Sequence, residues 1–357
     1  KGICLGPSNY LGRHYQQIPV SITVEGANIL TRNMIIFGQG AIRCHPYLLK
    51  EIHAASDTDA TRASVQFDQA FSGHVIFTLG NGLRTLLHGL TGGTLGSAPG
   101  SVGPETQRYY SQLMRFSAAF AFLADISLLI LGGALKRKER ISARLGDILS
   151  LLYLCSATLK RYKDDGRPAA DSPLLHWSMQ DALYRMQQAF EGLLDNFPAS
   201  VIARRTLRFM VFPLGKPFSQ PSDKLGHEIA TLMLSPGEAR DRLTAGIYVP
   251  ASADEPLGRL EQALQCAMVC EAVEAKLRAA VKTGRIPAQG DERIAAALKQ
   301  RVITTAELEL MGEMKSLRRS VIMVDDFPPD FGPEPGGEAA STPDAAQAQA
   351  DACTASA

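Results

Sequence analysis

One glutamate near the start of the chain, Glu25, stands where a carboxylate could act as a base. It follows an apolar, β-branched stretch (residues 21–24), and Gly26 and Asn28 come directly after it. This pattern predicts a helix that opens at about Asn28. The dipole of such a helix stabilises a nearby carboxylate as an anion, whereas apolar walls raise the pKa of a carboxyl. A general base near neutral pH and an ordinary glutamate at a helix start both fit this pattern.

The residues around Glu25 are part of a series of long motifs. Arg32 stands at the seventh position after Glu25, and the other motifs are KGICLGPSNYLGR (1–13), IIFGQGAIRCHP (35–46), LGGALKRKERISARLGD (131–147) and VDDF (324–327). The Glu25 segment resembles the part of acyl-coenzyme A dehydrogenases that carries the catalytic base, and residues 1–13 resemble their glycine loop. In order, from residue 1 to about 327, the chain resembles the bacterial fatty acyl-CoA dehydrogenases of β-oxidation that bear a long extra C-terminal region.

The resemblance implies a flavin oxidoreductase that converts a fatty acyl-CoA to the trans-2-enoyl thioester. Glu25 is the expected catalytic residue: it would take the α-proton while the β-hydrogen leaves as hydride to FAD. The backbone N–H of Glu25 would also stabilise the charge that develops on the thioester oxygen. Gly26 would let the substrate approach the backbone closely, so Glu25 and Gly26 are the expected substrate-binding residues.

FAD is the cofactor that the resemblance implies, with Gly2 and Asn28 as the expected contacts. Many relatives carry Thr and Gln two and four positions after the glutamate, where this chain has Ala27 and Ile29. No side-chain contact to the flavin is therefore expected from these two positions. We expect the chain to be the C-terminal part of a longer enzyme. This part lacks most of the FAD site, so we expect it to be inactive alone.

The expected partners are a fatty acyl-CoA substrate, an electron acceptor that is itself a flavoprotein, and further copies of the chain. The expected location is the cytoplasm, with peripheral contact to the inner membrane left open. The alternative function is a non-catalytic helical module for oligomerisation or membrane association. Nucleic acid is not an expected partner, because 37 Lys and Arg against 36 Asp and Glu give a formal net charge of only +1.

The fold class that the sequence predicts is all-α. Apolar residues recur at helical spacing, and β-branched alternation is confined to residues 320–324. The expected organisation is a helical catalytic bundle over 1–90, a Gly/Pro linker over 91–104, a helical C-terminal extension over 105–326, and a disordered tail over 327–357. The long helices are expected at Ile29–Ala54 with a break at Pro46, then at Ala63–Leu90, Tyr109–Leu135, Glu139–Tyr162, Pro173–Asn196, Asp223–Leu234, Leu257–Thr283 and Asp291–Met314.

Residues Phe116–Leu135 are about as long as a membrane span. Asp125 at their middle is costly in a bilayer, so they are expected to form a buried helix of a bundle. The Lys136–Arg140 cluster that follows is expected to be solvated.

No metal site is expected. The six cysteines form no CxxC pair, and the histidines are scattered without a Ser or Cys partner at a nucleophile elbow. Cys266 and Cys270, four residues apart, are expected to be packing residues.

Overall fold

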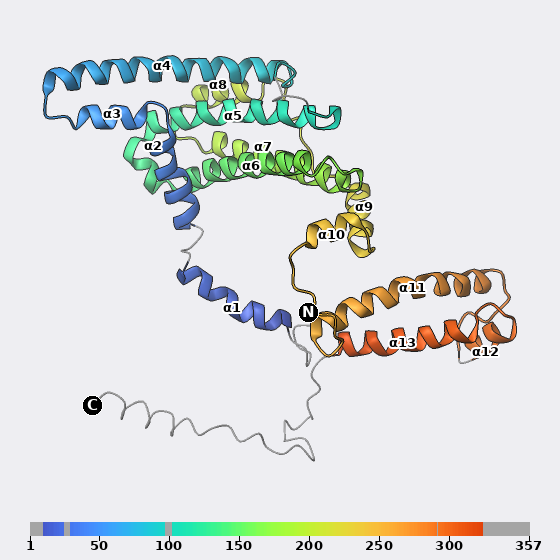
Figure 1. Ribbon diagram of the computed structural model, residues 1–357. Coiled ribbons are helices and arrows are strands. Elements are labelled where there is room, and N and C mark those ends of the chain that lie inside the picture. The colour runs from blue at the N-terminus through green and yellow to red at the C-terminus, as the bar shows by residue number, and fades with distance from the viewer. Residues whose placement is uncertain (1–9, 25–28, 97–101, 291, 324–357) are drawn as a thin grey trace, which may run out of the picture. The chain divides into compact units, whose positions relative to one another are not determined.

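The structure is a computed structural model that describes residues 10–24, 29–96, 102–290 and 292–323. These residues form helices and connecting turns, without a strand among them (Figure 1). The predicted all-α class is confirmed.

The chain divides into two compact units, one made of Ile18–Ile247 and the other of Tyr248–Ala357 with Lys1–Gln17. The larger unit holds the second half of α1 and all helices up to α10, and the smaller unit holds the first half of α1 together with α11 to α13. The helices of the larger unit are α1 (Tyr10–Val24, which also enters the smaller unit), the π-helix η2 (Ile29–Gln39), α2 (Gly40–Cys44), α3 (Leu48–Ala55), α4 (Ala60–Leu90), α5 (Pro104–Leu131), η3 (Gly132–Arg137), α6 (Glu139–Asp164), η4 (Ala169–Asp171), α7 (Ser172–Asp195), α8 (Val201–Val211), α9 (Asp223–Leu234) and α10 (Glu238–Thr244).

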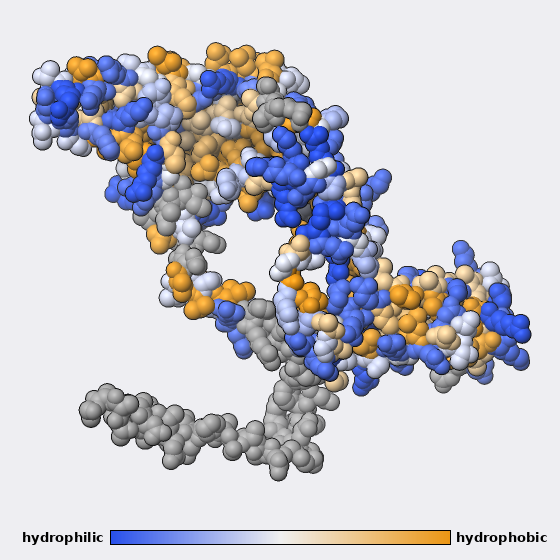
Figure 2. All heavy atoms as spheres, viewed as in Figure 1, coloured by the Kyte–Doolittle hydropathy of each residue, from blue (hydrophilic) through white to orange (hydrophobic). Residues whose placement is uncertain are grey.

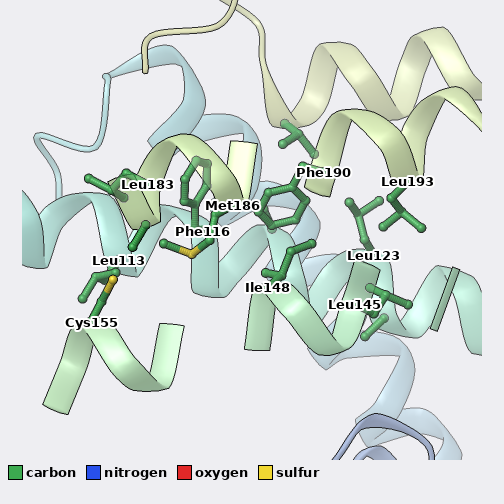
Figure 3. Close-up of a cluster of buried hydrophobic side chains, with 14 of the residues drawn as sticks. Leu113, Phe116, Leu123, Leu145, Ile148, Cys155, Leu183, Met186, Phe190 and Leu193 are labelled. Atoms are coloured by element: carbon green, nitrogen blue, oxygen red, sulfur yellow. The ribbon is translucent and has the colours of Figure 1, made fainter. Parts of the chain in front are cut away.

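The core of the larger unit lies between α5, α6 and α7, with contributions from α8. Phe116, Phe190 and Phe212 form its aromatic centre, with ring centroids 5.2 Å apart for Phe116–Phe190 and 6.3 Å apart for Phe190–Phe212. Figure 3 shows side chains from the three long helices interleaved around this centre. Large side chains that are withdrawn from water in this way supply most of the free energy that holds helices together.

Helix α5 is the segment whose apolar character suggested a membrane span. Among the described residues, the stretch Pro104–Arg137 is long and apolar enough to cross a membrane, and 39% of its most apolar window is buried. Phe116 and Leu123 are fully buried in the core, and Asp125 is buried with them. These residues therefore behave as a bundle helix, as predicted, although Leu129 and Ile130 at its end are exposed.

The Gly/Pro stretch after α4 was expected to separate two domains. In the structure α4 and α5 lie side by side in one unit, and the described residues 91–96 form a turn after the end of α4. Gly93 adopts a φ of 85°, and Gln112 of α5 donates to the carbonyl of Gly92 at 2.6 Å. The compact units divide near residue 248 instead, because α4 packs along α5.

Helix α4 begins at Ala60, three residues before the predicted Ala63, and Asp59 caps it. Asp59 accepts hydrogen bonds from the backbone N–H groups of Thr61 and Arg62, both at 3.1 Å. This satisfies two of the donors that a helix start leaves without partners. Farther along, α4 exposes a row of large apolar side chains, which contributes hydrophobic surface along its edge (Figure 2): Val65, Ile76, Leu79, Leu83, Leu87 and Leu90.

The smaller unit contains α11 (Pro256–Lys282), α12 (Glu292–Lys299) and α13 (Thr305–Ile322). The prediction of one helix over Asp291–Met314 was wrong, because Arg301 adopts a positive φ of 53° and Thr304 starts a new helix with a capping box. The β-branched run at 320–322 is likewise helical, as the last turn of α13.

Two of the described cysteines are packing residues with raised thiol pKa values. Burial raises the pKa of Cys155 to about 12 and that of Cys270 to about 11. Cys155 lies in the core of the larger unit, and Cys270 lies on α11 with its Sγ 3.6 Å from the carbonyl oxygen of Leu310. Both thiols therefore remain protonated at neutral pH, as expected of packing residues.

Candidate functional site

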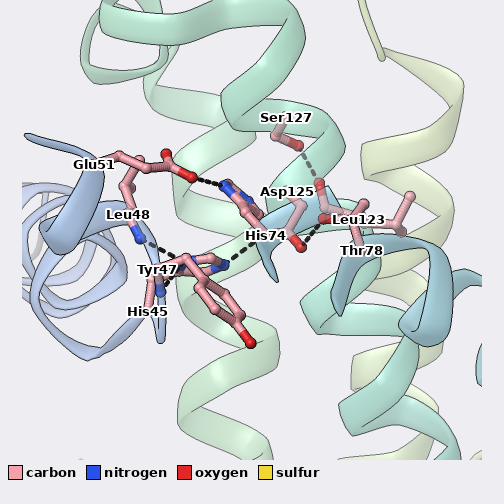
Figure 4. Close-up of polar contacts among 9 residues, drawn as sticks. All are labelled: His45, Tyr47, Leu48, Glu51, His74, Thr78, Leu123, Asp125 and Ser127. Carbon is pink, nitrogen blue, oxygen red and sulfur yellow. Dashed lines mark hydrogen bonds and ion pairs between the residues drawn. The ribbon is translucent and has the colours of Figure 1, made fainter. Parts of the chain in front are cut away.

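A buried polar network lies where the turn after α2, helix α3, helix α4 and helix α5 meet. It contains His45 from the turn, Glu51 from α3, His74 and Thr78 from α4, and Asp125 from α5 (Figure 4). Tyr47 stacks on His74 with the rings 10° from parallel. Its ring lies over Gly73, where a Cβ atom would come within 2.4 Å of it, so the glycine makes room for this packing.

His45 has a fixed tautomer. Its Nδ1 accepts hydrogen bonds from the backbone N–H groups of Tyr47 at 3.2 Å and Leu48 at 3.0 Å, which are free donors at the start of α3. A nitrogen that accepts cannot carry the proton, so the proton of the neutral ring is on Nε2. Nε2 lies 3.0 Å from Oδ1 of Asp125, which joins the turn to α5.

Asp125 is a carboxylate with partners on three sides. Its side chain is only 3% exposed; Thr78 donates to Oδ2 at 2.8 Å, and Nε2 of His74 lies 3.8 Å from Oδ1. The other ring nitrogen of His74, Nδ1, lies 2.8 Å from Oε1 of Glu51. Burial of an unpaired carboxylate would cost free energy of folding, and the partners of Asp125 reduce that cost. Because these partners come from different helices, the network links α3, α4 and α5.

His45, His74 and Asp125 also have the residue types of a metal site, and their ligand atoms lie within 4.8 Å of one another. His74 fits this role, because a metal-bound histidine usually donates its other nitrogen to a carboxylate, here Glu51. His45 does not fit, since binding through Nε2 would place the proton on Nδ1, against two backbone N–H donors. Two ligands do not make a closed site, so we assign no metal to the network.

An apolar cavity of about 310 Å³ borders the network. Three phenylalanine rings, Phe37, Phe77 and Phe120, form much of its wall, and His45 and Asp125 lie at one side. The cavity is therefore enclosed by residues from both the predicted catalytic part and the predicted extension.

The residues predicted from the sequence to carry the chemistry, Glu25, Gly26, Gly2 and Asn28, all lie outside the described residues. What the structure describes is the helix that follows them. The predicted helix start at about Asn28 agrees with η2, which begins at Ile29. Upstream, Tyr10–Val24 is helical, so the end of the motif that resembled a glycine loop belongs to α1.

Sequence reasoning missed the network, and treated its histidines as scattered residues. His45, His74 and Asp125 are separated by 29 and 51 positions, so no spacing rule joins them. One available clue was Asp125 itself, because a charged residue inside a long apolar helix must have a buried partner.

A protein-family model matches most of the chain. The family model described as acyl-CoA dehydrogenase, C-terminal, bacterial type, matches residues 42–327. No solved structure matches the chain. The matched range includes every residue of the network and all helices from α3 to α13. The chain therefore belongs to the acyl-CoA dehydrogenase family, whose bacterial-type C-terminal region it carries.

Proposed function

We propose that the protein is the C-terminal part of an FAD-dependent acyl-CoA dehydrogenase of fatty-acid β-oxidation. The observation that carries this proposal is the family match over residues 42–327. The Glu25 segment precedes that range, and its resemblance to the base-bearing segment of the family adds the chemistry. The reaction is the oxidation of a fatty acyl-CoA to its trans-2-enoyl thioester.

In this proposal Glu25 takes the proton from the α-carbon, and its own backbone N–H stabilises the charge on the thioester oxygen. Gly26 leaves room for the thioester beside the backbone. FAD, when bound, accepts the hydride from the β-carbon. Gly2 and Asn28, its expected contacts, lie outside the described residues.

Replacement of Glu25 by Gln in the natural full-length enzyme tests the proposal. The variant keeps the size of the side chain and removes the base, so turnover of a saturated acyl-CoA should fall by about 10²–10⁴-fold. Glu139→Gln is the matched control, because Glu139 is exposed at the start of α6 and should leave turnover unchanged. Wild-type turnover in Glu25→Gln would refute the assignment of the base.

Contact with an anionic membrane surface is a second candidate function, and one feature favours it. Leu129 and Ile130 are exposed at the end of α5, and the exposed basic residues of Lys136–Arg140 follow. Exposed apolar side chains beside clustered Lys and Arg are typical of surfaces that bind anionic lipid. This surface fits a cytoplasmic enzyme that binds the inner membrane peripherally.

Co-sedimentation with vesicles of anionic and of neutral lipid tests the membrane contact. We expect binding to anionic vesicles that weakens with salt and with the double change Lys136→Glu and Lys138→Glu. Equal recovery in the supernatant with both kinds of vesicle would rule the contact out. The expected flavoprotein acceptor and self-association remain proposals from the resemblance.

A further inference from the structure

A second pocket, of about 560 Å³, lies along the first turns of α5 and shares no lining residue with the cavity beside the buried network. Its other walls are the turn after α4 and the pair Pro217 and Phe218, which stands between α8 and α9. The side chains of α5 that line the pocket are three or four positions apart, so they share one face of the helix. They are Arg108, Ser111, Gln112 and Arg115.

The walls of this pocket are held by hydrogen bonds within the protein. Gln187 of α7 donates to the carbonyl of Phe218 at 2.9 Å and accepts from the backbone N–H of Phe218 at 3.1 Å. On the other side, Gln112 donates to the carbonyl of Gly92, and a Cβ atom at Gly93 would come within 3.0 Å of its Nε2. The pocket is therefore formed before any ligand binds, as is usual for small-molecule sites.

Arg115 is a buried cation without a carboxylate partner among the described residues. It is only 4% exposed; its Nη2 donates to the carbonyl of Val211 at 3.2 Å, and its buried Nε has no partner in the described part of the chain. Burial lowers the pKa of Arg115. A guanidinium has five N–H donors, and burying its charge without an anion costs free energy.

The charges around Arg115 are also positive. Burial lowers the pKa of His88 on α4, and the charges of Arg115 and Arg84 lower it further. Arg108 is a second guanidinium at the pocket, and no residue that lines the pocket is acidic. Residues 97–101, which lie outside the described part of the chain, include neither Asp nor Glu. A pocket lined by one sign of charge attracts ions of the other sign.

We propose that this pocket binds a phosphate group, held by Arg115 and Arg108. A phosphate ester carries a charge of about −1.5 to −2 at neutral pH, which balances two guanidinium groups, whereas a carboxylate balances one. The planar fork of Arg matches two phosphate oxygens at once. The proposal does not depend on Glu25 or on the proposed function.

The pocket has room for more than the phosphate itself. Its volume is within the range of about 300–1,000 Å³ that is usual for small-molecule sites. The buried Oε1 of Gln112 has no donor among the described residues, so it is free to accept a hydrogen bond from a hydroxyl or amino group of the ligand. We therefore expect a phosphate ester to bind more tightly than inorganic phosphate.

Calorimetric titration of the natural full-length enzyme tests the site, with adenosine monophosphate, inorganic phosphate and adenosine as probes at constant ionic strength. Arg115→Met removes the buried charge and keeps a long side chain. Arg205→Met is the matched control, because Arg205 is exposed on α8 and does not line the pocket. Amide hydrogen exchange of residues 92–96 and 105–115, with and without phosphate, locates the bound group.

We expect the wild type and Arg205→Met to bind both phosphate probes with equal affinity, and Arg115→Met to bind them about tenfold more weakly or less. Adenosine alone should not bind, and exchange in residues 92–96 should slow when phosphate is present. Tighter binding of adenosine monophosphate would identify a phosphate ester as the source of the group. Equal affinity for the two phosphate probes would identify the free ion as the source.

Unchanged affinity in Arg115→Met would overturn the proposal. The same conclusion would follow if the wild type bound no phosphate at millimolar concentration, if adenosine bound as well as its monophosphate, or if protection from exchange lay only outside residues 92–96 and 105–115. If Arg115→Met does not fold, Arg108→Met decides, because Arg108 is exposed and its loss spares the core. Wild-type affinity in Arg108→Met would then overturn the site.

Discussion

The two compact units are both helical, but different interactions hold them together. The larger unit has an aromatic centre of Phe116, Phe190 and Phe212, whereas the smaller unit is packed around aliphatic side chains such as Leu277 and Ile286. Large rings bury more surface per residue, so the larger core resists local opening better.

The placement of polar groups differs in the same way. In the larger unit Asp125 is buried, and the half-buried His45 pairs with it inside the bundle. In the smaller unit the described ion pairs lie near the surface, as between Lys276 and Glu307. Buried polar groups fix a geometry, whereas exposed pairs add only modest stability. The difference indicates that the larger unit, and not the smaller one, holds polar side chains in a fixed arrangement of the kind that a functional site needs.

The largest effect is expected from the aromatic centre. Phe116→Ala removes a fully buried ring and should destabilise the larger unit by about 3–5 kcal/mol. Leu277→Ala is the counterpart in the smaller unit, at about 2–5 kcal/mol. Amide exchange under increasing urea resolves the two units. If either variant destabilises both units equally, they are one cooperative structure and the comparison fails.

An intermediate effect is expected from the buried network. Asp125→Asn keeps the shape of the side chain but removes the charge beside His45 and weakens the bond from Thr78, at a cost of about 1–3 kcal/mol. Asp164→Asn, on the exposed end of α6, is the control and should change stability by less than about 0.5 kcal/mol. Urea unfolding of both variants measures this. Equal stability would mean that the network does not hold the larger unit together.

The smallest effect is expected at the start of α13, and it depends on pH. Hydrogen bonds from Lys276 and from the backbone of Thr304 lower the pKa of Glu307 below its usual 4.5. A carboxyl whose pKa is lowered by folding stabilises the protein above its unfolded pKa, and this contribution is lost as the pH falls through the lower folded value. The smaller unit should therefore lose stability below about pH 4.5.

Glu307→Gln should remove that part of the pH dependence, while Glu309→Gln, on the same helix and with no resolved ion pair among those described, should keep it. Amide exchange of α13 between pH 3 and 6 follows the change. An unaltered pH profile in Glu307→Gln would show that its hydrogen bonds contribute nothing measurable.

Much of the fold was predictable because a helix spaces its apolar residues regularly within a short stretch of sequence. Helical spacing predicted the start of α4 to within three residues, at Ala63 instead of Ala60, and it predicted the bounds of α9, Asp223–Leu234. The break inside Asp291–Met314 was missed because neither Gly nor Pro marks it; the turn depends on a positive φ at Arg301. The helices α8 and α10 were missed as well: α10 has only seven residues, whereas α8 has an amphipathic pattern at least as clear as that of α9.

The site was predictable only in part, and for a physical reason. The Glu25 segment is one continuous motif, so its resemblance to the family could be read directly. The network and the contacts of η2 join residues far apart in the chain, such as Arg32 with Asp147 and His45 with Asp125. Tertiary packing brings these residues together, and no local spacing encodes it.

The most direct test of the central claim is the product that the full-length enzyme forms from labelled fatty acyl-CoA, measured by mass spectrometry. We predict an enoyl thioester that has lost one α-hydrogen and one β-hydrogen, so that its mass is lower by both labels. A thioester recovered with both labels in place, or cleaved to the free acid, would contradict the assignment as an acyl-CoA dehydrogenase.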